Sequence, residues 1–238
     1  MVILISKKIL IALTTQTDST KIMKYSIVFF LLFASCCFGQ EIAKKDLIAV
    51  LDTIWETEQT PIRLRDTAMK RHGADSEEFK KYQKIYKKNH AVNEKKVKAI
   101  LDTYGWPSPE KSGNNGNWTL CNVLQHSDNA VREKYLPMMR QAVKDKKLEA
   151  RFLVRAADRI ATEKGELQWY GGQMKYYPAT KSFNVWPVYD PVNIDKRRAA
   201  IGLEPIAGFL KNRFNFEWNL EEQLQRTAEF TKQQKNKE

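Results

Sequence analysis

His126 is the residue whose type and neighbours most favour chemistry. It ends a short apolar stretch, with Gln125 before it and Asp128 after it. A histidine titrates near neutral pH and serves as a general base or acid. A lone histidine in such a place is also often a capping or buried, hydrogen-bonded side chain. The sequence therefore leaves two interpretations of His126, a site residue and a structural one.

Other polar residues are embedded in apolar patterns downstream. Asp158 follows apolar residues on a predicted helix, and Gln168 lies on one face of a predicted strand. Two arginines stand in the first turn of a predicted short helix, where free backbone N–H groups attract anions. We predict one concave site for a polar or anionic ligand, with His126 and Asp158 as candidates for catalysis and these residues for binding: Gln125, Arg159, Gln168, Tyr170, Gln173, Arg197 and Arg198. An Asp158–Arg159 pair that locks the helix to the following hairpin is the structural alternative.

Several sharper interpretations fail on spacing. The three histidines His72, His90 and His126 lie far apart, and no His-x-x-x-His pair occurs, so we expect no metal site. The glycines between 113 and 116 lack the Gly-Lys-Ser/Thr ending of a phosphate loop, and no Gly-x-Ser-x-Gly elbow is present. The sequence therefore predicts no cofactor.

The charge balance favours anionic partners. The formal net charge is +12, while 42% hydrophobic and 29% charged residues are an ordinary globular mix. The lysines gather in one predicted helix and the C-terminal tail, without a nucleic-acid-binding motif beside them. We expect no nucleic-acid partner, and a lysine-rich solvated face explains much of the charge.

The N-terminus reads as an export signal. Lys24 supplies a positive charge, residues 27–33 are apolar, and residues 34–39 are mostly small. We expect a signal peptide within residues 1–39, cleavage after Gly39, and a periplasmic or secreted protein. Residues 1–22 read as an upstream, misassigned start.

The cysteines give an alternative for the N-terminus. Lipid attachment at Cys36 or Cys37 would place a lipoprotein at the cell envelope, with membrane attachment only in that case, although the surrounding lipobox is imperfect. After cleavage only Cys121 remains, so no internal disulfide can form. Its apolar surroundings favour a buried, inert thiol.

The spacing of apolar residues predicts mainly helices. A first helix is expected over 42–58, and Thr60 with Pro61 reads as the start of a second. Ser76 opens a third, and Pro137 should kink or divide the helix that Asp128 caps. Further helices are expected over 118–125 and 149–161, and short ones follow Asp195 and Pro205.

The pattern changes after residue 165. Residues 166–170 alternate and are aromatic, which favours a strand, and residues 183–189 are its expected partner. We predict a mainly α (α+β) fold, a single globular domain over 40–231 with one small antiparallel β-hairpin near 166–189, and a basic frayed tail over 232–238.

Four segments together resemble the bacterial family called domain of unknown function 6624. They are Tyr104-Gly105-Trp106-Pro107; Leu124-Gln125-His126-Ser127-Asp128 with Tyr135-Leu136-Pro137; Ala157-Asp158-Arg159 with Gln168-Trp169-Tyr170-Gly171-Gly172-Gln173; and Asp195-Lys196-Arg197-Arg198 with Ile201-Gly202-Leu203. The likeness covers roughly residues 45–210. This sequence has His90 where the family pattern has aspartate, and Gly172 where it often has threonine. The resemblance implies a mainly helical, frequently exported domain and implies no reaction.

Two functions compete. The first is an exported binding module for a polar or anionic cell-envelope component or small ligand. The second is a hydrolase- or transferase-type enzyme with His126 as general base and Arg159 or Arg198 stabilising negative charge. A purely structural role would leave these residues scattered, and the sequence does not decide whether the protein is an enzyme.

Overall fold

The computed structural model describes residues 47–178 and 181–236. The chain divides into two units, Met1–Val50 and Leu51–Glu238. In the first unit residues 47–50 are described, and they are helical. The predicted signal peptide, with Cys36 and Cys37, lies outside the described residues. Within the described ranges, no helix has the length and apolar character that crossing a membrane requires.

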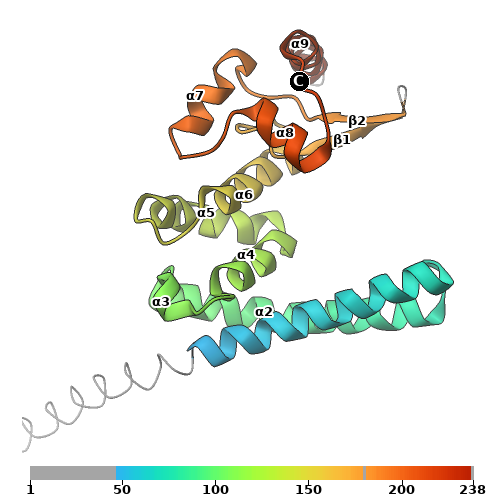
Figure 1. The fold of residues 1–238 in the computed structure, drawn as a ribbon, viewed down its shortest axis with the longest axis vertical. Coiled ribbons are helices and arrows are strands. Elements are labelled where there is room, and N and C mark those ends of the chain that lie inside the picture. Colours follow the sequence, from blue (N-terminus) through green and yellow to red (C-terminus); the bar gives the residue numbers. More distant parts are fainter. Residues whose placement is uncertain (1–46, 179–180, 237–238) are drawn as a thin grey trace, which may run out of the picture. The chain divides into compact units, whose positions relative to one another are not determined.

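The second unit opens with two long helices that lie side by side (Figure 1). The first covers residues 51–72, and α2 covers Glu77–Tyr104. Ser76 caps α2 as predicted, since its hydroxyl accepts a hydrogen bond from the backbone N–H of Phe79. Leu51 and Ile54 on the first helix are fully buried, so the predicted apolar stripe faces the core.

The predicted break at Pro61 is wrong, because the first helix runs through it without interruption. Proline has no backbone N–H, so the carbonyl of Thr57, four residues earlier, loses its helical partner. Asn89 on α2 supplies the missing donor, with its Nδ2 2.9 Å from that carbonyl oxygen. The neighbouring helix therefore makes the proline tolerable.

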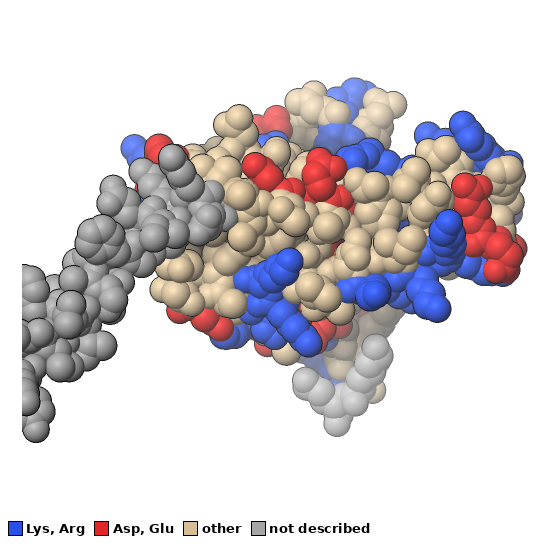
Figure 2. Space-filling view, turned by 90° about the horizontal axis from the view of Figure 1, so that it is seen from below, with Lys and Arg blue, Asp and Glu red and all other residues tan. Residues whose placement is uncertain are grey.

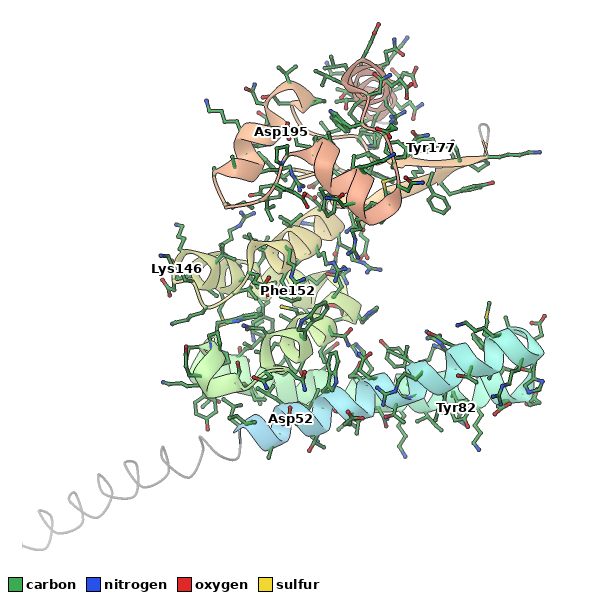
Figure 3. The ribbon with its side chains drawn as sticks, viewed as in Figure 1. Asp52, Tyr82, Lys146, Phe152, Tyr177 and Asp195 are labelled. Atoms are coloured by element: carbon green, nitrogen blue, oxygen red, sulfur yellow. The ribbon has the colours of Figure 1, made fainter. Side chains whose placement is uncertain are left out.

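The central helices follow in chain order: α3 (Pro109–Ser112), α4 (Gly116–His126), α5 (Asn129–Lys144) and α6 (Ala150–Glu163). Asp128 caps α5 as predicted, and α5 continues through Pro137 instead of dividing there. Phe152 lies on α6 (Figure 3). It is buried and meets the ring of Trp118 of α4 edge-on, with ring centroids 5.0 Å apart. This contact joins the two helices that carry the inner pocket described below.

The C-terminal part holds the hairpin, which confirms the predicted mainly helical fold with one small antiparallel sheet. β1 (Met174–Tyr177) pairs with β2 (Ser182–Val185), inside the predicted range but later than the predicted first strand. Residues 166–170 form no strand; within them Gln168 makes only an isolated parallel bridge to Val188. The remaining elements are η1 (Pro191–Asn193), α7 (Ile194–Ala199), α8 (Ile206–Phe214) and α9 (Leu220–Lys235).

Asp195 does not cap the short helix in which it lies. Asn193 occupies the N-cap position of α7, and Asp195 stands in its first turn. Its carboxylate accepts a 2.7 Å hydrogen bond from the backbone N–H of Ile206, the first residue of α8. Asp195 therefore caps the N-terminus of α8 and not that of α7.

Candidate functional site

His126 lies at the C-terminal end of α4, facing two rings of α2. The centroid of its imidazole is 6.4 Å from those of both Tyr86 and His90, and its plane is at right angles to both. Tyr86 and His90 stack on each other at 5.7 Å. The side chain of His126 makes no hydrogen bond or ion pair within the described residues, so its ring nitrogens are free for a ligand.

His90 is held by a carboxylate that the sequence did not single out. Glu58, on the first helix, is 1% exposed, and its two oxygens lie 3.3 and 3.2 Å from Nδ1 of His90. Asn93 also donates to this carboxylate, with Nδ2 2.9 Å from Oε1. The other nitrogen of His90, Nε2, is buried and meets no acceptor with hydrogen-bond geometry in the described part of the chain.

The surroundings shift the pKa values of the two histidines in opposite directions. The hydrogen bond to Glu58 raises the pKa of His90 above its usual value, against the effect of burial. Burial lowers the pKa of His126, and the positive charge of Arg159 and the neighbouring His90 lower it further. These shifts favour the protonated form of His90 and the neutral form of His126.

A groove of about 530 Å³ lies along α2 and is bordered by His126. Three lysines line it together with both histidines: Lys87, Lys95 and Lys98. Lys98 forms an ion pair with Glu94 at 3.6 Å, whereas Lys87 and Lys95 have none among the described residues. Figure 2 shows Lys and Arg side chains spread over the face seen there, with acidic groups among them.

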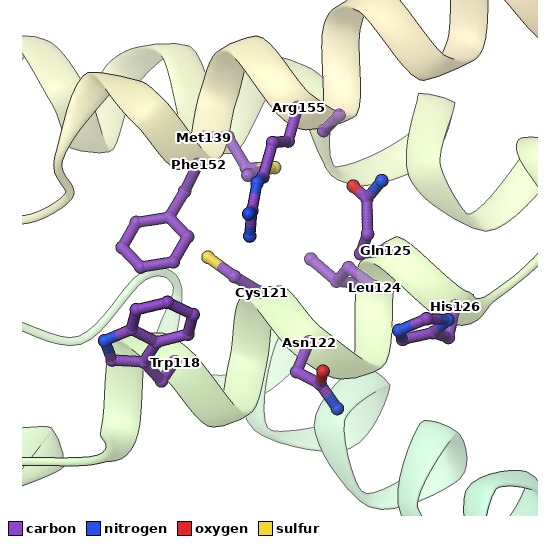
Figure 4. A pocket seen from close by; sticks show the side chains of 10 residues that line it. Trp118, Cys121, Asn122, Leu124, Gln125, His126, Met139, Phe152 and Arg155 are labelled. Atoms are coloured by element: carbon purple, nitrogen blue, oxygen red, sulfur yellow. The ribbon is translucent and has the colours of Figure 1, made fainter. Parts of the chain in front are cut away.

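A smaller inner pocket of about 70 Å³ lies between α4, α5 and α6. His126 lines it as well, so this residue borders both cavities. Arg155 points from α6 toward α4 and ends near Cys121, with Gln125 and Phe152 on either side (Figure 4). Burial raises the pKa of the Cys121 thiol well above its usual value, as expected of an inert thiol.

Asp158 belongs to a different part of the molecule. It is fully buried, and its carboxylate accepts backbone hydrogen bonds from Trp169, Tyr170 and Gly172 at 2.7–3.0 Å. Burial raises its pKa to about 6, although these N–H groups favour the charged form. With both oxygens occupied, Asp158 holds the segment between α6 and the hairpin, while Arg159, the other member of the predicted pair, forms an ion pair with Glu163 on α6 instead.

Gln168 performs a similar task. Its side chain is completely buried and donates to the backbone carbonyls of Gln173 and Trp186, at 3.0 and 2.7 Å. Its own oxygen accepts from the backbone N–H of Gln173 at 2.9 Å. Tyr170, also buried, packs against Val154 and Ala157. These contacts hold the strands of the hairpin to the segment before it.

The arginines of α7 are engaged in the same region. Arg198 is 1% exposed and donates to the carbonyls of Tyr170 and Glu204, both at 2.7 Å. Arg197 donates to the carbonyls of Trp169, Tyr189 and Asp190. Arg159 lies on α6 and pairs with Glu163 at 2.9 Å.

The structure thus divides the predicted site residues into two groups. Gln125 and His126 line the inner pocket, and the charge of Arg159 acts on His126. The rest form a buried network around the hairpin: Asp158, Gln168, Tyr170, Gln173, Arg197 and Arg198. No hydrogen bond joins His126 to the second group within the described residues. The part of each residue in binding or catalysis stays a prediction.

Glu58 and Arg155 line or support the two cavities but were not predicted as site residues from the sequence. Glu58 continues the apolar stripe of Leu51 and Ile54 at helical spacing, so a carboxylate at a core position was a readable signal. Arg155 offers a weaker signal, because an arginine between Val154 and Ala156 is common on the flank of an amphipathic helix. No group of three or more His, Cys, Asp or Glu residues in the described ranges is placed to hold a metal ion.

Comparison with known proteins gives one match. No curated protein and no solved structure matches this chain significantly. The model of a family of unknown function, DUF6624, matches residues 47–215, a range that contains α2 to α8 with both cavities and the buried network of the hairpin. Since this match covers well over half of the sequence, the chain belongs to the DUF6624 family.

Proposed function

We propose that this protein is a binding module that holds a polar or anionic ligand in the groove beside His126. The supporting observation is the pair of lysines, Lys87 and Lys95, that line the groove without a carboxylate partner in the described residues. Unpaired ammonium groups around a concavity attract anions. The imidazole of His126, which borders the groove, adds a hydrogen-bonding group.

The place of action is part of the proposal. An apolar segment after Lys24, followed by small residues, is typical of a signal peptide, so we propose that the module works outside the cytoplasm. A polar or anionic component of the cell envelope would then be available to it. Fractionation of cells that produce a tagged chain tests this, and a purely cytoplasmic signal with an uncleaved N-terminus would contradict it.

A ligand screen tests the binding function. The melting temperature of the full chain is measured with envelope sugars, peptides, nucleotides and metal salts, for the wild type and His126→Ala. We expect one class of anionic compound to raise the wild-type melting temperature and to have no effect on the variant. His72→Ala is the matched control, because that histidine is half exposed and pairs with Glu78 far from the groove. A sharp loss of stability in His126→Ala, with no ligand effect on either protein, would make His126 structural.

A hydrolase- or transferase-type enzyme is the second candidate. The observation in its favour is an imidazole at His126 that makes no hydrogen bond within the described residues and whose pKa is lowered by burial and by the charge of Arg159. Arg198 is not available for substrate, because its guanidinium is buried and bonded to backbone carbonyls. Incubation of a bound compound with the wild type, followed by mass spectrometry, distinguishes the two functions. A product that His126→Ala does not form supports the enzyme, and unchanged compound supports the binding module.

A further inference from the structure

The inner pocket contains a cation without a counter-charge. Arg155 makes no hydrogen bond and no ion pair within the described residues. Its charged neighbours are Arg151 and Arg213, which together with burial lower its pKa. The nearby carboxylate of Glu149 is bonded to Arg151 at 3.0 Å. A half-buried guanidinium among like charges is unfavourable unless an anion compensates it.

The rest of the lining limits what that anion can be. Beside Arg155 stands the amide of Gln125, whereas the amide of Asn122, which also lines the pocket, points away from Arg155 (Figure 4). The other walls are largely apolar: Trp118, Cys121, Leu124, Met139, Phe152 and Ala156. One guanidinium matches the two oxygens of a carboxylate, whereas a phosphate dianion calls for more donors than this lining offers. An apolar wall suits the carbon chain of the same ligand.

The size of the pocket sets an upper limit. A cavity of about 70 Å³ has room for about five water molecules, at roughly 15 Å³ of cavity volume each. The ring contact between Trp118 and Phe152, with the Arg151 guanidinium 5.0 Å from the Trp118 ring, bounds one side. A ligand of a few carbon atoms with one charged end fills such a space.

We propose that the inner pocket is a binding site for a small aliphatic monocarboxylate, held by the guanidinium of Arg155 and the side-chain amide of Gln125. This site is separate from the lysine-lined groove, although His126 borders both cavities. It does not depend on the function proposed for the groove, and its donors come from α4 and α6 instead of α2.

Calorimetric titration of the full chain with sodium butyrate, at constant ionic strength, tests the proposal. We expect saturable binding to the wild type and about tenfold or greater weakening in Arg155→Met, since a charge-assisted hydrogen bond is lost. Arg155→Lys should be intermediate, because it keeps the charge and loses the planar fork. Arg140→Met, on the exposed side of α5, is the control and should bind like the wild type. Replacing Lys87 and Lys95 by glutamine should leave butyrate binding unchanged while it impairs the groove.

Three outcomes would overturn the proposal. They are absence of butyrate binding to the wild type, equal binding to Arg155→Met, and an Arg155-dependent response to inorganic phosphate instead of butyrate. If Arg155→Met does not fold, Arg155→Lys is compared with the wild type in its place. Equal affinity of the two proteins for butyrate would then refute the site.

Discussion

The side-chain amide of Asn89 takes the place of the backbone N–H that Pro61 lacks. In a regular helix the N–H of residue 61 would donate to the carbonyl of Thr57. Here Asn89 Nδ2 donates to that carbonyl instead, at 2.9 Å from its oxygen. The donor that proline cannot supply to the helix is thus supplied by a side chain of the next helix. The relationship explains why the first helix is continuous, and it joins that helix to α2 one residue before the Glu58–His90 contact.

A double-mutant cycle measures this relationship. Asn89→Ala leaves the Thr57 carbonyl without its partner, and we expect a loss of about 1–2 kcal/mol in the free energy of unfolding. In a Pro61→Ala background the helix supplies its own N–H, so the same change should cost less. Urea denaturation of the four proteins gives the coupling energy. Equal costs in the two backgrounds would show that Asn89 acts independently of Pro61.

The Glu58–His90 contact should make stability depend on pH. The pKa of His90 is raised in the folded protein above the usual 6.5, so the folded state binds more protons. Its stabilising contribution is therefore complete below about pH 6.5 and is lost as the pH rises through the raised value. His90→Gln should cost about 3 kcal/mol at pH 5.5 and clearly less at pH 9. Denaturation of the half-exposed His72→Gln at both pH values provides the control, and a cost that grows with pH would contradict the prediction.

The buried carboxylate of Asp158 predicts a second pH effect. Its pKa rises from 3.8 to about 6 on folding, so the folded state again binds more protons between these values. The advantage of the wild type over Asp158→Asn should be largest near pH 4 and should shrink by roughly 2–3 kcal/mol as the pH rises through about 6. Thermal denaturation at pH 4.5, 5.5 and 7.5 follows the trend. A difference that stays constant would mean that the carboxylate titrates at its ordinary value.

Two glycines test the packing against Ile206. Gly171 and Gly73 both have positive φ, +78° and +80°, so alanine is strained by the backbone at either position. A Cβ on Gly171 would also lie 2.7 Å from Cδ1 of Ile206, which is fully buried, whereas Gly73 has open space around it. We expect Gly73→Ala to cost about 1 kcal/mol and Gly171→Ala about 1–3 kcal/mol more. Similar melting temperatures for the two variants would indicate that Ile206 moves aside.

The candidate site shows the limit of prediction from pattern. Asp158, Gln168 and Arg198 were predicted as site residues, and each of them is buried and hydrogen-bonded within the protein. Their partners are backbone groups of loops, however, and a sequence does not show which loop carbonyls and N–H groups lie within reach. Arg155 was passed over for the opposite reason, because its lack of a partner is visible only when its neighbours in space are known.

The sequence by itself determined the mainly helical fold, the caps at Ser76 and Asp128, and the small hairpin near 166–189, because these features depend on neighbours along the chain. The tertiary structure decided that the helix continues through Pro61, that Asp195 caps α8, and that His126 stands apart from Asp158. Each of these depends on a hydrogen bond or a contact between residues distant in sequence. Conformational preferences along the chain determine where helices and strands form. The free energy gained when buried polar groups hydrogen-bond to one another determines which distant residues come into contact.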